Sequence, residues 1–393
     1  MGFAEEALKL HKKLRGKIEI KSKQPELTRE ILSLLYTPGV AAVSREIAKD
    51  KEKAYEYTSK WNTIAIVTDG SRVLGLGNIG PEAALPVMEG KALLFKSFGN
   101  VDAFPICLST QNTEEIVNII KHISPGFGGI NLEDIASPRC FEIVDALNGM
   151  LDIPVYHDDQ HGSGVVATAA LINSLKLVGK KTSEVKVVVI GAGAAGYGAT
   201  RVLHTIGVKN IVVVDSLGVI HPSRSDLNKY KQQLAEMTNR EGVEGGLIDA
   251  MNGADVLIGF SGIAGLVKNE MIRKMGSDAI VFALTNPIPE IMPEDAKEAA
   301  IVATGRSDYP NQINNVLVFP SMMNGLLNVR AKVVNDEILV TGAHALADIV
   351  KDEMSKDYIV PLPTDERILP AVSKAVKEAA IKTGVAKIKN NSK

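Results

Sequence analysis

The chain has 393 residues, of which 45% are hydrophobic and 23% are charged. This balance is typical of a soluble globular protein with two or three domains, and it excludes disordered, fibrous and small disulfide-bonded proteins. Forty-four basic and 46 acidic side chains give a net charge of -2. Because the chain has no excess of positive charge, nucleic acid and anionic lipid are not expected partners, and a small molecule is favoured.

The cysteines and the N-terminus bear on the cellular compartment. Cys107 and Cys140 cannot form a disulfide framework and follow no metal-binding spacing, so we expect buried thiols in a reducing compartment. The first residues lack the cationic start and apolar stretch of a secretory signal, and no run of about eighteen apolar residues occurs. We therefore predict a cytoplasmic protein without a membrane span.

From residue 61 onward, strand-like and helical patterns alternate. The strand-like apolar runs lie at 63–67, 102–108, 128–132 and 153–157. The helical segments between them lie near 82–97, 113–122 and 138–149. Such alternation predicts βα units around a parallel sheet, and therefore an α/β fold.

A second βα series follows a break in the pattern. A long apolar helix near 162–178 ends at Gly179, and a polar stretch precedes the next strand, at 185–190. We place the domain boundary there, which predicts a first domain at 1–180 and a second at 181–393. The last part of the second domain is predicted to be helical.

The second series carries a glycine-rich motif, GAGAAGYG, directly after its first strand. It fits the G-x-G-x-x-G pattern, in which glycines permit a tight turn and let backbone N–H groups at a helix N-terminus approach a pyrophosphate. The predicted cofactor contacts in this loop are Gly191, Gly193, Ala194, Ala195 and Gly196. The strand before it and the helix after it predict a Rossmann dinucleotide-binding domain.

The next strand ends at Asp215, the position that binds the adenine ribose hydroxyls in such domains. An acid here favours NAD. Arg224, Lys229 and Lys231 follow in the next loop and could fold back toward a 2′-phosphate, so NADP stays open. Two later strands end near Ser261-Gly262 and Asn286, which we expect to face the cofactor because ligands bind at the carboxyl ends of parallel strands.

Acidic pairs follow two predicted strands of the first domain. The strand at 128–132 runs into Glu133-Asp134, and the strand at 153–157 runs into Asp158-Asp159. Four carboxylates at one sheet edge repel each other unless a cation or protons intervene, and oxygen ligands without cysteine suit Mg²⁺ or Mn²⁺. The alternative is that these acids cap the helices that follow.

Several motifs together resemble the malic enzyme family over about residues 25–385. They are LYTPGVA at 35–41, TDGSRVLGLGNIG at 68–80, EGKALLF at 89–95, NLEDI at 131–135, HDDQHG at 157–162, GAGAAG at 191–196, ALTNP at 283–287 and NNVLVFP at 314–320. The resemblance implies oxidative decarboxylation of L-malate to pyruvate and CO₂ with reduction of NAD or NADP, dependent on Mg²⁺ or Mn²⁺. It also implies that the first domain holds substrate and metal and that the enzyme is a homodimer.

The resemblance further implies a role for individual residues. The metal ligands of the family fall on Glu133, Asp134 and Asp159. The substrate-binding residues fall on Arg72, Asn286 and Asn315. The lysine that takes the proton from the C2 hydroxyl falls on Lys91, with Asp158 beside it, and the tyrosine that returns a proton to C3 falls on Tyr36.

Two of these roles carry a condition. A lysine acts as a base only when it is neutral, so the pKa of Lys91 must fall from its usual value near 10.4. Tyr36 lies far from the other site residues in the sequence, which leaves open whether it serves its own site or that of a partner subunit.

Two other functions fit the same motifs. In a malolactic reaction, retained NAD and the same metal would yield lactate without net reduced cofactor. In a non-enzymatic dinucleotide sensor, the acids would only cap helices, and cofactor would bind without metal-dependent turnover.

Overall fold

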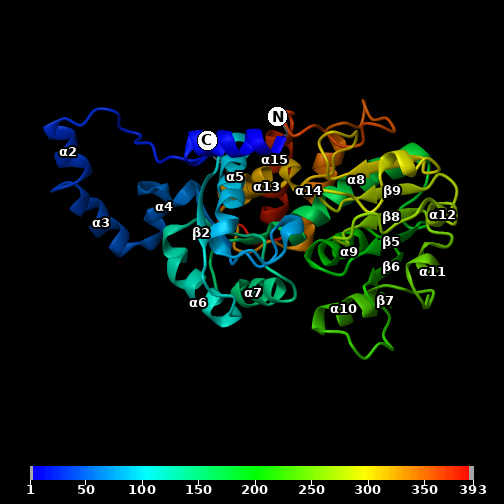
Figure 1. The fold of residues 1–393 in the computed structure, drawn as a ribbon. Helices are drawn as coiled ribbons and strands as arrows, with labels where there is room; N and C mark the ends of the chain where they lie inside the picture. The colour runs from blue at the N-terminus through cyan, green and yellow to red at the C-terminus, as the bar shows by residue number, and fades with distance from the viewer. Residues whose placement is uncertain (1–2, 389–393) are drawn as a thin grey trace.

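The computed structural model describes residues 3–388, and it contains two sheets with helices between their strands (Figure 1). The first sheet has the order β2-β1-β3-β4, and all its neighbouring strands are parallel. Its strands are β1 (Thr63–Thr68), β2 (Asp102–Cys107), β3 (Gly129–Leu132) and β4 (Val155–His157). The predicted α/β alternation is therefore observed, with boundaries that agree within a few residues.

The register of the first sheet decides where its loops meet. Val67 of β1 is opposite Leu132 of β3, and Leu132 is opposite His157 of β4. The residues that follow these three positions therefore leave the sheet at the same edge. Glu133 begins one of these loops and Asp158 begins another.

The second sheet has the order β10-β9-β8-β5-β6-β7 and is parallel except for its edge strand β7. Its strands are β5 (Lys186–Ile190), β6 (Asn210–Asp215), β7 (Gly218–Val219), β8 (Val256–Gly259), β9 (Ile280–Ala283) and β10 (Ile301–Thr304). Alternate residues of β5 pack into two separate hydrophobic clusters, Val187 and Val189 in one and Val188 and Ile190 in the other. Both faces of this sheet are therefore covered, as expected for parallel strands.

Helices connect the strands and join the two sheets. Those of the first half are α4 (Ala54–Tyr57), α5 (Pro81–Gly99), α6 (Thr113–Ile123), α7 (Arg139–Leu147) and α8 (Ser163–Val178). Those of the second half are α9 (Ala194–Thr205), α10 (Lys229–Met237), α11 (Leu247–Met251), α12 (Asn269–Ile272), α13 (Phe319–Asn328), α14 (Asp336–Asp348) and α15 (Ile368–Lys382). Helix α8 is buried throughout residues 163–175 and contacts α9 and α14, so one hydrophobic cluster runs through both halves.

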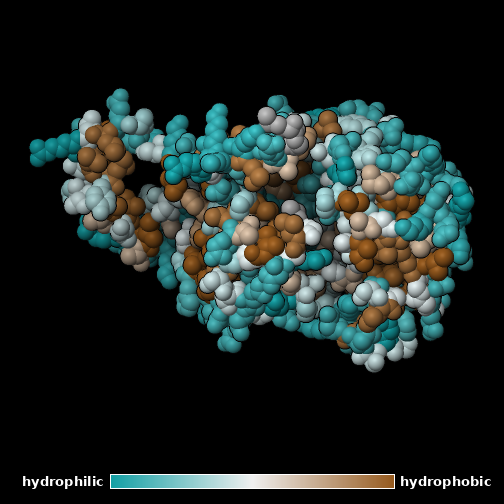
Figure 2. Space-filling view, viewed as in Figure 1, coloured by the Kyte–Doolittle hydropathy of each residue, from teal (hydrophilic) through white to brown (hydrophobic). Residues whose placement is uncertain are grey.

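The N-terminal segment lies apart from this core. It contains α1 (Phe3–Leu14), α2 (Arg29–Leu35) and α3 (Val40–Lys49), and none of their residues is buried. Helices α2 and α3 project at the left of Figure 1, and Figure 2 shows hydrophobic side chains on the same projection. We call residues 27–49 the N-terminal arm.

Two sequence expectations concern burial and membranes. Cys140 is buried and Cys107 is half-buried, and neither forms a disulfide. Within residues 3–388, no helix combines the length and apolar character needed to cross a bilayer.

Candidate active site

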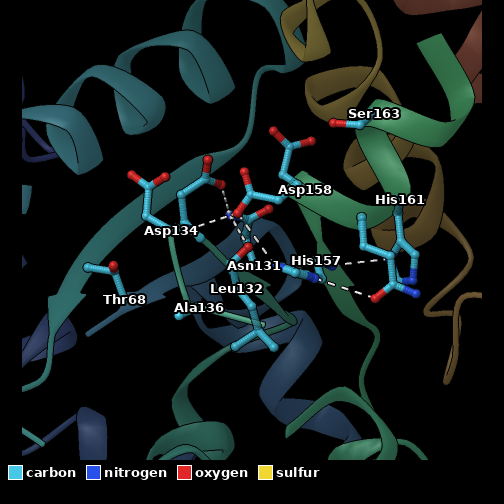
Figure 3. A network of polar contacts seen from close by, with 12 residues as sticks. Thr68, Asn131, Leu132, Asp134, Ala136, His157, Asp158, His161 and Ser163 are labelled. Carbon is cyan, nitrogen blue, oxygen red and sulfur yellow. Dashed lines mark hydrogen bonds and ion pairs between the residues drawn. The ribbon is translucent and has the colours of Figure 1, made fainter. Parts of the chain in front are cut away.

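The acids that follow β3 and β4 converge at one edge of the first sheet (Figure 3). Glu133, Asp134 and Asp159 each offer a carboxylate oxygen, and these atoms lie within 4.8 Å of one another. The backbone N–H of Asp134 donates to Oδ2 of Asp159 at 3.0 Å, which ties the two loops together. We call Glu133, Asp134, Asp158 and Asp159, together with Lys91, the acidic cluster. The three converging carboxylates, Glu133, Asp134 and Asp159, fit the oxygen ligands that Mg²⁺ or Mn²⁺ prefers.

A single π turn, η5 (Asp158–Gly162), leads from β4 directly into α8. Such turns are rare and frequent at functional sites. Gly162 at the end of this turn lies against Asp158, and a Cβ there would collide with the Asp158 carboxylate. The glycine therefore allows the turn to fold back over a buried acid.

Lys91 reaches the acids from α5. Its Nζ lies 2.5 Å from Oδ2 of Asp158 and 2.8 Å from Oε1 of Glu133, and it lies 4.1 Å from the ring centroid of Phe319. Burial lowers the pKa of Lys91, but the charges of Asp158 and Glu133 outweigh burial and raise the pKa above its usual range. The side chain is therefore an ammonium in this arrangement.

The acids differ in their pKa values because they differ in their partners. Burial raises the pKa of Glu133 and of Asp158, although Lys91 opposes this effect at both residues. Burial also acts to raise the pKa of Asp159, but His157, whose Nε2 lies 3.5 Å from Oδ2 of Asp159, together with Lys91 and the backbone N–H of Asp134 outweighs burial and lowers the pKa. Oδ1 of Asp158 is buried and makes no hydrogen bond among the described residues.

The loop after β1 forms another wall of the site. The backbone N–H of Arg72 donates to the carbonyl oxygen of Asp134 at 3.0 Å. Arg139 donates to Asp69 at 2.7 Å and to Ser71 at 2.9 Å, and Ser71 accepts a hydrogen bond from the backbone of Ala136. These contacts hold the loop in place. No sequence pattern indicated that Arg139 and Asp69 pair.

The dinucleotide motif has the expected local structure. Helix α9 begins at Ala194, and Gly193 is its N-cap. Gly191 has a φ of 99°, and a Cβ at Gly196 would collide with the carbonyl oxygen of Gly191. These glycines therefore permit the turn and the close packing that the motif requires.

A buried glutamate, which the sequence did not reveal, organises the loops after β8 and β9. Oε1 of Glu290 accepts hydrogen bonds from the backbone and the hydroxyl of Ser261, both at 2.9 Å. The backbone and hydroxyl of Thr285 also donate to Glu290. Glu290 is 0% exposed, and because its partners belong to both loops, it holds them together. Covariation between positions 290 and 285 is the kind of signal that could have revealed this role of Glu290.

One cleft of about 2030 Å³ joins these parts. Its lining includes most of the predicted site residues, namely Arg72, Lys91, Glu133, Asp134, Asp159, Gly191, Gly193, Ala194, Ala195, Gly196, Asp215, Ser261, Gly262, Asn286 and Asn315. The two halves meet at Arg72, because a Cβ on Gly262 would lie 3.1 Å from Nη2 of Arg72. The volume is ample for a dinucleotide together with a small acid.

Two predicted residues lie outside the lining. Asp158 is fully buried behind it, where Lys91 and Nδ2 of Asn315, at 3.1 Å, donate to its Oδ2. Tyr36 follows α2 in the N-terminal arm and is 72% exposed. The structure therefore does not bring Tyr36 to the cleft of its own chain.

The chain matches two family models. Residues 15–118 match "Malic enzyme, N-terminal domain", and residues 160–390 match "Malic enzyme, NAD binding domain". The chain belongs to the malic enzyme family. This confirms the resemblance and the expected pairing of a parallel-sheet domain with a Rossmann domain.

Known malic enzymes resemble the chain along nearly all of its length. The "Bifunctional malic/malolactic enzyme" of Bacillus subtilis is 53% identical over 99% of this chain and 95% of that protein. The "NAD-dependent malic enzyme" of Geobacillus stearothermophilus is 54% identical over 95% of this chain and 79% of that protein. The crystal structure of malic enzyme from Pyrococcus horikoshii is 50% identical, with a TM-score of 0.95 over 99% of this chain and 93% of that one.

Proposed function

We propose that the chain catalyses the oxidative decarboxylation of L-malate to pyruvate and CO₂, with reduction of NAD or NADP and with Mg²⁺ or Mn²⁺ as the metal. In this proposal residues 1–180 hold the substrate and metal, and residues 181–393 hold the dinucleotide. The observation that carries it is that Glu133, Asp134 and Asp159 of the acidic cluster line one cleft with the glycine-rich loop. A cation site and a dinucleotide site in one cleft allow hydride transfer next to a Lewis acid.

The proton chemistry follows from the contact between Lys91 and Asp158. Lys91 must lose a proton before it can take one from the C2 hydroxyl of malate. Its Nζ lies 2.5 Å from Oδ2 of Asp158, but Asp158 and Glu133 raise the pKa of Lys91. Lys91 can therefore act as a base only when a cation held by Glu133, Asp134 and Asp159 offsets these acids, and Asp158 is then the group within reach of its proton. We therefore assign Lys91 as the base and Asp158 as the residue that holds its proton.

Other residues of the cleft bind and orient the substrate. Arg72 lies between the acidic cluster and Gly262, where its guanidinium can hold a carboxylate of malate. Asn286 and Asn315 also line the cleft, and Asn315 donates to Asp158. Glu133, Asp134 and Asp159 would hold the cation, which when bound polarises the oxygen on C2 and accepts charge as CO₂ departs.

An assay of L-malate with Mn²⁺ and each dinucleotide tests this function. We expect the absorbance of reduced nicotinamide to rise with the formation of pyruvate and without lactate. Lactate without net reduced cofactor would instead indicate the malolactic reaction, which the name of the Bacillus subtilis relative gives beside the malic one. Dinucleotide binding without any turnover would indicate a sensor and contradict the proposal.

We also propose that the enzyme is a homodimer in which Tyr36 serves the partner's cleft. Among the described residues, no tyrosine lines the cleft, although the final step needs a proton donor to carbon. The N-terminal arm exposes the apolar residues Leu27, Leu32, Leu34 and Leu35 next to Tyr36. Short helices with exposed apolar faces are marginal alone and gain stability by packing against another surface, here a second copy of the chain.

Mixing two inactive variants tests the exchange of Tyr36. Each mixed dimer of Tyr36→Phe and Lys91→Ala would contain one intact site if Tyr36 reaches the partner. Random mixing should then restore about one quarter of wild-type activity, because half of the dimers are mixed and each has one of two sites. If Tyr36 acted within its own chain, mixing would restore nothing, and this part of the proposal would be wrong.

A further inference from the structure

The carboxylate at the end of β6 is already bound by two cations. Nη1 of Arg224 lies 2.9 Å from Oδ1 of Asp215, and Nη2 lies 3.1 Å from Oδ2. Nζ of Lys231 lies 2.6 Å from Oδ2, and the backbone N–H of Leu217 donates to Oδ1 at 2.9 Å. Both oxygens of Asp215 therefore have strong partners in the folded chain. Lys229, the third cation considered from the sequence, instead contacts Asp145.

A second acid completes the charge balance. Nη2 of Arg224 also lies 2.6 Å from Oδ2 of Asp226, and Nε lies 3.0 Å from Oδ1 of Asp226. The guanidinium is thus held by two carboxylates, and its side chain is only 9% exposed. We call Asp215, Arg224, Asp226 and Lys231 the ribose cluster. Two acids and two cations make it neutral overall, and all four residues line the cleft.

This balance distinguishes the two dinucleotides. NAD carries a neutral 2′-hydroxyl, whereas NADP carries a 2′-phosphate with a charge of about −1.5 to −2. A hydroxyl can share Asp215 and Lys231 without breaking an ion pair. A phosphate would need Arg224, whose donors are committed to Asp215 and Asp226, and it would be repelled by both acids.

We propose that the ribose cluster selects NAD over NADP, and that Arg224 and Lys231 are phosphate ligands held out of use by Asp215 and Asp226. This proposal rests on the proposed function, because it assumes that the cleft binds a nicotinamide dinucleotide. It makes the two acids, rather than a lack of basic residues, the reason for the preference. Removing an acid should therefore move the preference toward NADP without adding any cation.

Equilibrium binding of NAD and NADP by calorimetry, with the full chain and without malate, tests the proposal. The wild type should bind NAD more tightly than NADP. Asp215→Ser should shift the ratio of the two dissociation constants toward NADP by about 10²-fold, because two cations lose a strongly bonded acid. Asp226→Asn should shift it in the same direction by about 5-fold, because Arg224 then loses one of its two acids and keeps Asp215. Adding Arg224→Ala to Asp215→Ser should remove most of the gain.

The outcomes separate this proposal from the broader one. A wild type that prefers NADP, or an unchanged ratio in Asp215→Ser, would overturn the role of the ribose cluster. If Asp215→Ser does not fold, as judged by circular dichroism, the ratio in Asp226→Asn decides the question. Failure of the proposed function appears differently, as the absence of binding for both dinucleotides or of malate turnover with either.

Discussion

The acidic cluster and the ribose cluster both lie at the carboxyl ends of parallel strands, but they differ in charge balance. The acidic cluster places four carboxylates around the single cation Lys91, whereas the ribose cluster pairs two acids with two cations. The first is formally three charges short of neutrality, and a divalent cation would supply most of the difference. The second needs no ion. The carboxyl-end edge of the first sheet thus prepares a site for a metal, and that of the second sheet prepares a site for an uncharged ribose.

Glu290 shows a third way to hold a buried acid. Among residues 3–388 no cationic side chain pairs with it, and its oxygens accept hydrogen bonds from Ser261 and Thr285. Burial by itself therefore does not make an acid a metal ligand. The acidic cluster differs from Glu290 because several of its carboxylates lie close to one another, so that they repel unless a cation binds between them.

Removing divalent cations should have the largest effect on malate turnover. If it had none, the contrast between the two clusters in their need for a cation would be wrong. Thorough chelation should abolish detectable malate turnover, because the acidic cluster would lose the charge that balances it. NAD binding should persist, because the ribose cluster is neutral. Calorimetry and the nicotinamide assay measure the two effects, with Mn²⁺ added back as the control. Undiminished turnover after chelation would show that the acidic cluster holds no catalytic metal.

Replacing the lysine of each cluster should affect a different quantity, kcat for Lys91 and NAD affinity for Lys231. Lys91→Ala should lower kcat by about 10² to 10⁴-fold and leave NAD affinity unchanged, because it removes a general base. Lys231→Ala should change NAD affinity by less than about 10-fold and keep kcat within about 2-fold. Steady-state kinetics and calorimetry measure both.

The matched control is Lys229→Ala, two residues from Lys231 but bound to Asp145 on the surface. It should leave both kcat and NAD affinity within about 2-fold of the wild type. If Lys91→Ala retained its turnover, Lys91 would not be the base. If Lys229→Ala changed NAD affinity as much as Lys231→Ala, the contacts of Lys231 with Asp215 would not be responsible.

Replacing Glu290 should have the smallest effect. Glu290→Gln keeps the size of the side chain but turns an amide N–H₂ toward groups that are themselves donors. We expect a loss of about 1–3 kcal/mol in the free energy of unfolding and weaker binding of NAD, since the loops of Ser261 and Thr285 lose their common acceptor. Thermal unfolding and calorimetry measure these changes.

Glu294→Gln serves as the control for Glu290, because Glu294 is exposed to solvent and accepts only from Tyr309 among the described residues. It should leave stability within about 0.5 kcal/mol of the wild type. Equal stability of both variants would mean that the loops do not depend on Glu290.

Much of the fold could be predicted because it depends on local patterns. Alternating apolar runs and helical segments indicated the βα units, and the glycine spacing at Gly191, Gly193 and Gly196 indicated the dinucleotide turn. These features follow from backbone sterics and from hydrophobic periodicity within a few residues, so a single sequence reveals them. The acidic pairs were visible for the same reason, since they directly follow predicted strands.

Contacts between distant segments were not predictable in this way. Arg139 meets Asp69 across 70 positions, and Glu290 contacts Ser261 across 29 positions. The sequence also left open whether Arg224 and Lys231 fold back onto Asp215, because an ion pair between loops leaves no periodic trace. The position of Tyr36 in an exposed arm is a property of the whole fold, although its motif was recognisable.

By itself, the sequence determined the class of fold, the dinucleotide turn and the family, because each depends on residue type and short spacing, and it predicted the residues that carry the chemistry. The tertiary structure decided which of these residues share a cleft, that Lys91 is paired with two acids, and that the ribose cluster is neutral. The physical reason is that charge balance and burial are set by the register of neighbouring strands and the packing of loops, which bring together groups far apart in the chain.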